Sequence, residues 1–462
     1  MTVRLVEVEF PEPMVPTEAP VVAKSVYDGR IERALGAMQE RGLSRLVVYA
    51  DREHFANMHF LIGYDPRFEE ALLIMSPGNR PALFVGNEGM AYAAISEVEM
   101  DVVLCQSFSL MGQPRGKSPS LKQMLSDAGI GRGARVGIVG SKCFSPHEVD
   151  DPEHASDAPG LIVDTLRSLA GYENVVNATD IFTDPVNGIR ICLDVDDIAF
   201  FEYGAEVVYS GVRRVLKGLR EGVSALEASA LLGYAGYPPL SCHITMSFGE
   251  RAMLGLASPS PANKLRIGDF VNFGYGVWGA NMARSGFAVE RKDQLAPEAR
   301  GVVEDLYIPY FQMMARWYSS LAVGRTAGDV YEAVKDFVRD QQYGVVLNPG
   351  HLIHLDEWPH SPFSPGSTCE LRSGMAMQCD IISSTGAPYY GVHVEDGLVL
   401  ADAAIRAELN SKYPAAAERI RQRRRRFTET LGIRLSDDVL LMSSIQGVLS
   451  PYMLRPELAF GL

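Results

Sequence analysis

The chain has 462 residues, of which 47% are hydrophobic and 22% charged, and its 57 acidic and 43 basic residues give a formal net charge of −14. This length is sufficient for two or three domains with substantial cores, which excludes a small disulfide scaffold and a disordered tail. The negative charge repels phosphate backbones and anionic membranes, so neither a nucleic acid nor a membrane is an expected partner.

The first residues and the cysteines indicate in which cellular compartment the protein is expected. Residues 1–20 hold several glutamates and prolines where a signal peptide needs an apolar run, and no window of the chain reaches 18 uninterrupted apolar residues. The six cysteines form no CxxC pair, so neither a zinc knuckle nor a disulfide framework is encoded. We therefore expect a cytoplasmic protein with reduced thiols.

The first part of the chain predicts an arm followed by an α/β domain. Residues 1–25 are proline-rich and lack periodicity, which predicts an arm lying on a surface of this chain or of a partner subunit. Residues 26–188 then alternate helical spacing with short apolar runs typical of strands. The helices are predicted at 31–41, 121–128 and 161–170, and the strands at 46–49, 71–75, 82–85, 102–104 and 136–139.

Residues 189–430 predict a second, α+β domain. Its pattern favours helices packed on one face of a curved antiparallel sheet. The helices are predicted at 194–216, 224–235, 297–321, 327–342 and 406–427, and the strand regions at 268–289, 375–382 and 391–399. The arginine-rich end of the last helix is interpreted as a solvated face or a contact with an acidic partner subunit. Residues 431–462 form a tail whose apolar residues predict packing on the body of the protein.

Histidines and buried acids mark the candidate site. Five of the nine histidines fall between residues 243 and 393, and Asp380 and Glu395 each sit in an apolar strand. A carboxylate in such a place needs a histidine, an arginine, a metal or a substrate as its partner. His393 and Glu395 are two residues apart on one strand, so their side chains share a face. The five histidines are His243, His351, His354, His360 and His393.

The order of motifs resembles the creatinase and Xaa-Pro peptidase family, whose catalytic domain is called the pita-bread fold. The resemblance spans residues 190–430 and implies an α/β N-terminal creatinase-like domain followed by a pita-bread catalytic domain. It is carried by Asp196-Asp197, by the stretches 220–224 and 247–249, by 265–271, by 349–354, by Gly374-Met375, and by 391–396.

The resemblance also implies a ligand set that this sequence only partly supplies. In the family's metallopeptidases, two metal ions share two aspartates, one histidine and two glutamates. His351, Asp380 and Glu395 match three of these positions, whereas no acid occurs between Asp269 and Glu290, and Asn281 stands where the second aspartate would be. Two carboxylates and one histidine are too few for a bridged pair, although they can hold one Zn or Mn ion.

Creatinase is the family's precedent for a pocket without metals. By this resemblance the catalytic residues are His351, which moves the proton, with Asp380 and Glu395, which orient it and bind a cationic group. No cofactor is expected, with one divalent metal as the alternative. Creatine itself is doubtful, because residues 255–258 lack the histidine that creatinase has there.

Six further residues are candidates for substrate binding. Arg284 is expected to grip a substrate carboxylate or to hold Glu395 or Asp380, and His354 is expected to narrow the pocket. Cys379 points away from Asp380 on its strand and is discounted as a nucleophile. The substrate-binding candidates are His243, Asn281, Arg284, His354, Glu357 and His393.

Three functions stay open at this point. The first is a creatinase-like, metal-independent hydrolase that cleaves a C–N bond of a small polar nitrogenous carboxylate. The second is a metal-dependent Xaa-Pro aminopeptidase or dipeptidase. The third is a small-molecule lyase or an inactive pita-bread binding protein; residues 356–359 read Asp-Glu-Trp-Pro, as in the family's dimethylsulfoniopropionate lyases. By resemblance we expect a homodimer with a small-molecule substrate.

Overall fold

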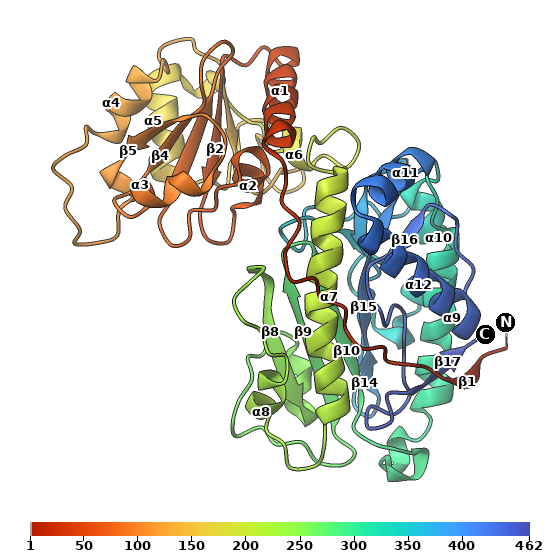
Figure 1. Cartoon of the computed structure of the whole chain (residues 1–462). Helices are drawn as coiled ribbons and strands as arrows, with labels where there is room; N and C mark the ends of the chain where they lie inside the picture. Colours follow the sequence, from red (N-terminus) through yellow and green to blue (C-terminus); the bar gives the residue numbers. More distant parts are fainter. Residues whose placement is uncertain (1) are drawn as a thin grey trace. The chain divides into compact units, whose positions relative to one another are not determined.

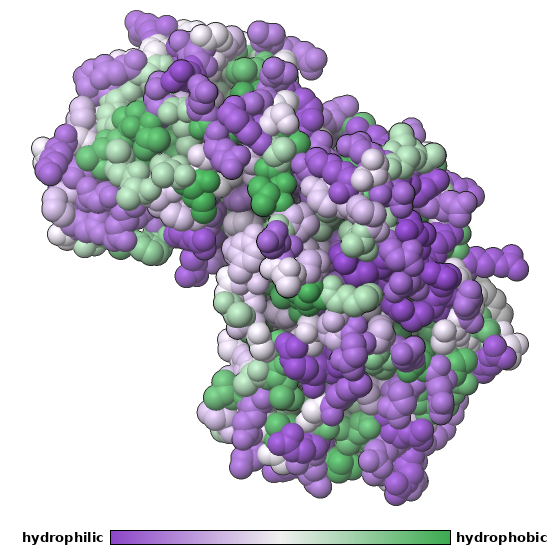
Figure 2. Space-filling view, viewed as in Figure 1, coloured by the Kyte–Doolittle hydropathy of each residue, from purple (hydrophilic) through white to green (hydrophobic). Residues whose placement is uncertain are grey.

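The computed structural model describes residues 2–462 and divides the chain into two compact units (Figure 1). One unit holds the residues up to Val21 together with Cys192–Leu462, and the other holds Val22–Ile191. Hydrophilic residues cover most of the face shown in Figure 2, and apolar residues gather in small patches. Within residues 2–462 there is no helix with both the length and the apolar character needed to cross a membrane.

The unit Val22–Ile191 is built on a six-stranded mixed sheet in the order β5-β4-β3-β2-β6-β7. Alternate residues of β2 enter two different cores: Leu46 and Val48 pack in one, and Val47 and Tyr49 in the other. Because helices cover both faces, the strands are nearly continuous apolar runs, as the sequence predicted. The strands are β2 (Arg45–Ala50), β3 (Ala71–Met75), β4 (Ala82–Val85), β5 (Asp101–Leu104), β6 (Val136–Val139) and β7 (Val175–Asn177).

The helices of this unit pack on the two sides of that sheet. Ala34 and Met38 of α1 and Phe60 of α2 belong to one core, whereas Leu121 of α4 and Leu166 of α5 belong to the other. The helices are α1 (Lys24–Glu40), α2 (Ala56–Ile62), α3 (Gly89–Tyr92), α4 (Leu121–Asp127), α5 (Gly160–Ala170) and α6 (Asp180–Thr183), with short turns η1 (Ala93–Ile95), η2 (Gln106–Phe108) and η3 (Tyr172–Asn174).

The other unit has an antiparallel sheet in the order β11-β12-β15-β10-β9-β8, with β16 paired to β15. A separate two-stranded ladder joins β13 to β14. The strands are β8 (Leu240–Phe248), β9 (Phe270–Val277), β10 (Ala280–Phe287), β11 (His351–Leu352), β12 (Ala376–Gln378), β13 (Ser383–Gly386), β14 (Tyr390–Val392), β15 (Val394–Leu400) and β16 (Val439–Leu441).

Helices cover this sheet, and the long helix α7 runs along it in Figure 1. Its first turn is held by a capping box between Asp194 and Asp197, which satisfies backbone N–H groups at the helix start. The helices are α7 (Val195–Gly218), α8 (Ala225–Ala230), α9 (Ile308–Ser320), α10 (Ala327–Val338), α11 (Ala403–Lys412) and α12 (Pro414–Thr430), with turns η4 (Gly249–Leu254), η5 (Lys292–Gln294), η6 (Pro297–Ala299), η7 (Val303–Tyr307) and η8 (Gln341–Tyr343).

Two predicted helices differ from the structure. The segment predicted as one helix at 406–427 is broken into α11 and α12 at Tyr413, because Pro414 has no backbone N–H and begins a new helix at its first position. The segment predicted as a helix at 297–321 becomes α-helical only from Ile308, after the 3-10 helix η6 and the π-helix η7.

The arginine-rich end of α12 is not a solvated face throughout, which corrects the prediction. Arg423 is buried and binds both Glu202 and Glu206 of α7, at 2.5 and 2.6 Å. Arg419 also binds Glu202. These charges therefore join two helices of the same chain.

The N-terminal arm lies on its own chain. Strand β1 (Arg4–Glu7) pairs antiparallel with the last strand, β17 (Leu458–Gly461). Further along, the Met14 backbone N–H donates to Glu206, and the Tyr209 hydroxyl donates to the carbonyl of Pro11. The arm and the C-terminal tail are thus parts of one packed unit.

A tight hairpin between β9 and β10 positions several residues of the candidate site. Val277 and Ala280 pair directly, so only Trp278 and Gly279 form the turn between β9 and β10. Gly279 has φ +77°, and a Cβ atom there would lie 2.1 Å from the ring of Phe201. Only glycine meets both conditions. This turn fixes the register that places Asn281, Ala283 and Ser285 on one face of β10.

Candidate functional site

A cavity of about 200 Å³ lies over this hairpin. It is lined by residues of β8, β9, β10, β13, β14 and β15, by the 3-10 helix η4 and by the loops beside them. The lining residues are Cys242, Thr245, Ala252, Met253, Gly255, Leu256, Phe270, Asn272, Gly274, Asn281, Ala283, Ser285, Glu357, Asp380, Ile382, Ser383, Ser384, Tyr390, Gly391, His393 and Glu395. Five candidates from the sequence are among them: Asn281, Glu357, Asp380, His393 and Glu395.

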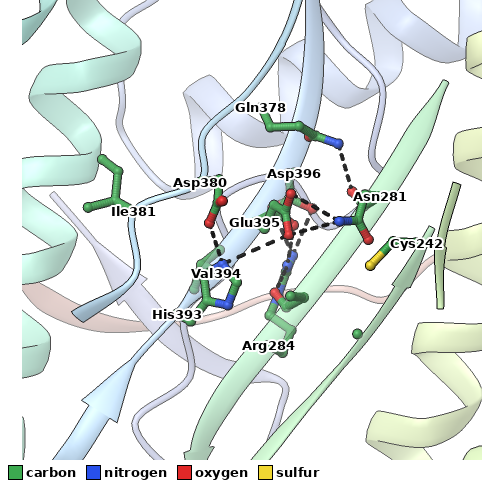
Figure 3. Close-up of polar contacts among 12 residues, drawn as sticks. Cys242, Asn281, Arg284, Gln378, Asp380, Ile381, His393, Val394, Glu395 and Asp396 are labelled. Carbon is green, nitrogen blue, oxygen red and sulfur yellow. Dashed lines mark hydrogen bonds and ion pairs between the residues drawn. The ribbon is translucent and has the colours of Figure 1, made fainter. Parts of the chain in front are cut away.

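Asp380 and His393 form the closest polar pair of the site (Figure 3). Nε2 of His393 lies 2.7 Å from Oδ1 of Asp380, and both side chains line the cavity. Asp380 follows β12 and His393 immediately precedes β15, so neighbouring strands bring them together. The carboxylate orients the imidazole, which is the arrangement that general acid–base catalysis uses.

The amide of Asn281 connects two carboxylates (Figure 3). Its Nδ2 donates to Glu357 at 2.9 Å and to both oxygens of Glu395 at 3.1 Å. Since both partners are acceptors, the nitrogen must face them, and this orients the amide. Its Oδ1 is buried without a hydrogen-bond partner.

Arg284 does not reach the cavity, which corrects its predicted role. Its Nη2 binds both oxygens of the buried Asp396 at 2.9 and 2.8 Å, and its Nη1 donates to backbone carbonyls. Arg284 is three residues from Asn281 on β10, so the two side chains point to opposite faces of the sheet. The guanidinium is therefore structural: it holds the backbone carbonyl of Glu395 but neither the Glu395 carboxylate, nor Asp380, nor a group in the cavity.

His351 lies behind the carboxylates rather than in the cavity. Its Nε2 is 3.6 Å from Oδ2 of Asp380 and 3.6 Å from Oε1 of Glu395, and its Nδ1 is 2.9 Å from the Leu352 carbonyl oxygen. The ring of Trp358 stacks on it with 4.0 Å between centroids. His351 is fully buried and is not one of the lining residues.

Two other predicted histidines lie outside the lining. His243 is exposed, and its Nε2 is 3.2 Å from the Leu256 carbonyl oxygen, while its neighbours Cys242 and Thr245 face the cavity. The register of β8 shifts between Cys242 and Thr245, which turns His243 outward. His354 is buried edge-on against Phe201.

Burial and neighbouring charges shift the pKa values of the site, together at Glu395 and in opposition at Asp380 and the two histidines. Burial and the nearby charge of Asp380 raise the pKa of Glu395 to about 7. Burial also acts to raise the pKa of Asp380, but the hydrogen bond and charge of His393 outweigh it and lower that pKa. For His351 and His393, burial lowers the pKa and the facing carboxylates raise it, with a net increase.

Three groups of the site can reach one metal ion. Ligand atoms of His351, Asp380 and Glu395 lie within 4.8 Å of one another, and all three residues are buried. One histidine and two carboxylates are a known donor set for a single Zn or Mn ion.

Sequence reasoning missed several lining residues. Asn272 and Gly274 of β9 and Ser285 of β10 face the cavity with Asn281. The signal was the two-residue period of the strands, which puts Ser285 on the face of Asn281. Cys242 was also missed; burial and the charge of Glu357 raise the pKa of its thiol well above the usual range.

The curved antiparallel sheet with its covering helices and the His–Asp–Glu cluster define a pita-bread protein. The family model for metallopeptidase family M24 matches residues 200–441, and the chain belongs to that family. No match is found among curated protein sequences.

Solved structures of similar fold are peptidases. An Xaa-Pro dipeptidase from Bacillus anthracis has a TM-score of 0.61 and 16% identity, over 82% of this chain and 96% of that one. The dipeptidase PepE from Mycobacterium ulcerans has a TM-score of 0.62 and 18% identity, over 82% and 94%. A prolidase from Thermococcus sibiricus has a TM-score of 0.63 and 17% identity, over 81% and 95%. At these identities the likeness establishes the fold.

The bridged metal pair of the resembling metallopeptidases does not fit these residues. None of the cavity-facing positions of the β9–β10 hairpin is a carboxylate. They are Phe270, Asn272, Gly274, Asn281, Ala283 and Ser285. Two divalent ions need several anionic oxygens, and here the Asn281 amide already donates to Glu395. The donor set is that of a single ion or of a hydrogen-bonded network.

Proposed function

We propose that this chain hydrolyses a C–N bond of a small nitrogenous molecule without a bridged pair of metal ions. The observation that carries the proposal is the Asn281 amide, which donates to Glu395 and Glu357 at the position expected to hold an aspartate. The cavity of about 200 Å³ is small for a ligand pocket, which supports a small substrate.

The residues of the cavity can carry both halves of a hydrolysis. Water adds to the substrate carbon and a C–O bond forms while His393 takes the water proton. The C–N bond then breaks, the nitrogen keeps its electron pair, and His393 returns the proton to it, so that one water is consumed and an amine leaves. We assign the proton to His393 rather than to His351 because His393 lines the cavity. Asp380 orients His393, and His351 is a positioning residue behind the two acids.

The test combines metal content with turnover. We expect purified protein to hold less than one equivalent of transition metal by mass spectrometry and to cleave members of a panel of guanidino, ureido and amide compounds in the presence of EDTA. His393→Gln should abolish turnover. One or more equivalents of metal that disappear in Asp380→Ala, with activity that EDTA removes and Mn²⁺ restores, would contradict the proposal.

A second candidate is a metal-dependent Xaa-Pro peptidase. The specific observation in its favour is the ligand distance among His351, Asp380 and Glu395, which suits one ion. It predicts cleavage of Xaa-Pro dipeptides only after Mn²⁺ or Zn²⁺ is added.

The cellular location and the oligomeric state of the protein are also proposals. The family resemblance and the composition of the chain support a cytoplasmic homodimer. Sedimentation of the purified protein at twice the mass of one 50.6 kDa chain is the expected result.

A further inference from the structure

We propose that the cavity selects an organic cation that carries N–H groups and a short apolar substituent but no carboxylate. This inference rests on the proposed function, because it names the class of substrate for the same site. It departs from the nitrogenous carboxylate that the sequence alone suggested.

The charges around the cavity are the first reason. Glu357, Asp380 and Glu395 line it, and no lysine or arginine is among the lining residues. Arg284 is held on the opposite face of β10 by Asp396. The side chains that can oppose these acids are His393, which lines the cavity, and His351 behind it, and both already pair with Asp380 or Glu395. A substrate carboxylate would therefore meet three acids and no lysine or arginine, whereas an organic cation can pair with the carboxylate of Glu357.

Unpartnered acceptors are the second reason and are independent of the first. Among residues 2–462, Oδ1 of Asn281 and Oγ of Ser285 find no hydrogen-bond partner, and the two residues are only 3% and 4% exposed. Both residues line the cavity, and Figure 3 shows Asn281 next to Glu395 and Cys242. A carbonyl oxygen can only accept, so the ligand must bring an N–H or O–H donor to it. Quaternary ammonium and sulfonium ions lack such a donor.

Part of the remaining wall of the cavity is apolar, beside the polar residues Thr245, Asn272, Ser383 and Ser384. Met253, Leu256, Phe270, Ile382 and Tyr390 line it together with the acids. A ligand with a charged head at Glu357 and Glu395 and a short alkyl chain against these side chains would satisfy both parts of the wall. Alkylguanidinium and alkylammonium ions have this form.

The test is calorimetric titration of the full chain with four matched probes in the presence of EDTA. Butylguanidinium is the expected ligand. Butylurea removes its charge, 4-guanidinobutyrate adds a carboxylate, and butyltrimethylammonium removes the N–H groups. We expect each of the last three to bind at least tenfold more weakly. Equal or tighter binding of 4-guanidinobutyrate, or equal binding of butylurea, would overturn the inference.

A pair of variants locates the effect. Glu357→Gln keeps the shape and the acceptor for Asn281 but removes a charge, so butylguanidinium should bind about tenfold more weakly while butylurea is unchanged. Glu408→Gln, an exposed change on α11, is the control and should bind both probes as the native chain does. An unchanged affinity of Glu357→Gln for butylguanidinium would count against the charge argument. If Glu357→Gln does not fold, the affinities of the native chain for the four probes still test the proposed class of substrate.

Hydrolysis measured in the same samples separates this inference from the proposed function. Selective binding of the cation without cleavage of any C–N bond would refute the function and leave the inference standing. Cleavage of a carboxylate-bearing compound in preference to the cation would refute the inference and leave the function standing.

Discussion

Asn281 is a hydrogen-bond donor at the position where a metal-binding aspartate is expected. Its amide donates to Glu395 and Glu357, whose negative charges a metal ion would otherwise offset. Asn281→Asp removes these donors and sets a third carboxylate against the two acids. We expect the variant to lose about 2–3 kcal/mol of stability without metal and to regain it with Mn²⁺, as thermal unfolding with and without the ion will measure.

Asn272→Asp is the matched control for that variant. Asn272 also lines the cavity, but its Nδ2 donates only to the Gly255 carbonyl, at 3.3 Å. The variant adds a carboxylate to the cavity without breaking the contacts of Glu395, so Mn²⁺ should stabilise it less. Equal stabilisation of the two variants by Mn²⁺ would contradict the prediction, because a new carboxylate at Asn281 would then favour the ion no more than one at Asn272.

His59 makes the unit Val22–Ile191 sensitive to acid. Burial, together with the charges of Arg30 and Arg67, lowers the pKa of His59 from 6.5 to about 3. Between these pH values the unfolded chain binds a proton that the folded chain does not, so acidification favours unfolding. His59→Gln should remove a dependence of up to about 1.4 kcal/mol per pH unit. Urea unfolding at several pH values between 7 and 4 measures it, and parallel curves for the two proteins would refute it.

The sequence contained part of the information on individual site residues. Asn281 and Arg284 are separated by an odd number of positions on one strand, which already puts their side chains on opposite faces. The exchange of roles between His351 and His393 could not be predicted, because each histidine lies at or immediately before the start of a strand and the sequence does not show which ring faces the cavity. In the structure His351 lies behind the carboxylates of Asp380 and Glu395 and stacks on Trp358, whereas His393 lines the cavity.

At the scale of elements, periodic segments were predicted and interrupted ones were not. The strands β3, β4 and β6 begin and end at the predicted residues, because both of their faces are buried and the apolar run has the length of the strand. Pro414 marks the break in the sequence, but the helical spacing continues on both sides of it and predicts a single helix.

The ion pairs between α7 and α12 give a testable prediction at the scale of elements. Arg423 is 1% exposed and binds Glu202 and Glu206, which are equally buried. Arg423→Ala leaves two buried carboxylates short of a partner and should cost about 3–5 kcal/mol. Arg425→Ala on the same helix removes an exposed pair with Glu418 and should cost under about 1 kcal/mol. Chemical denaturation measures both, and similar losses would contradict the structure.

At the scale of the whole molecule, the fold class followed from the sequence but the place of the arm did not. Alternating strands and helices predict an α/β domain, and helices with long strand regions predict an α+β domain. The arm has no periodicity of its own, and its strand exists only through pairing with β17, about 450 residues away along the chain. Such a contact leaves no local pattern.

The arm therefore offers a test of how stability is divided between the two units. Deleting residues 2–21 removes the β1–β17 pairing, the Met14 N–H that donates to Glu206 and the Pro11 carbonyl that accepts from Tyr209. Together these losses should cost on the order of 3 kcal/mol. Hydrogen exchange should speed up in β17 and α7 and stay unchanged in β2, β3 and β6, because the unit Val22–Ile191 has its own two cores. Tyr209→Phe, which loses a single hydrogen bond to Pro11, is the milder control. Faster exchange in β2 after the deletion would mean that the two units unfold together, and the division of the chain into independent units would then be wrong.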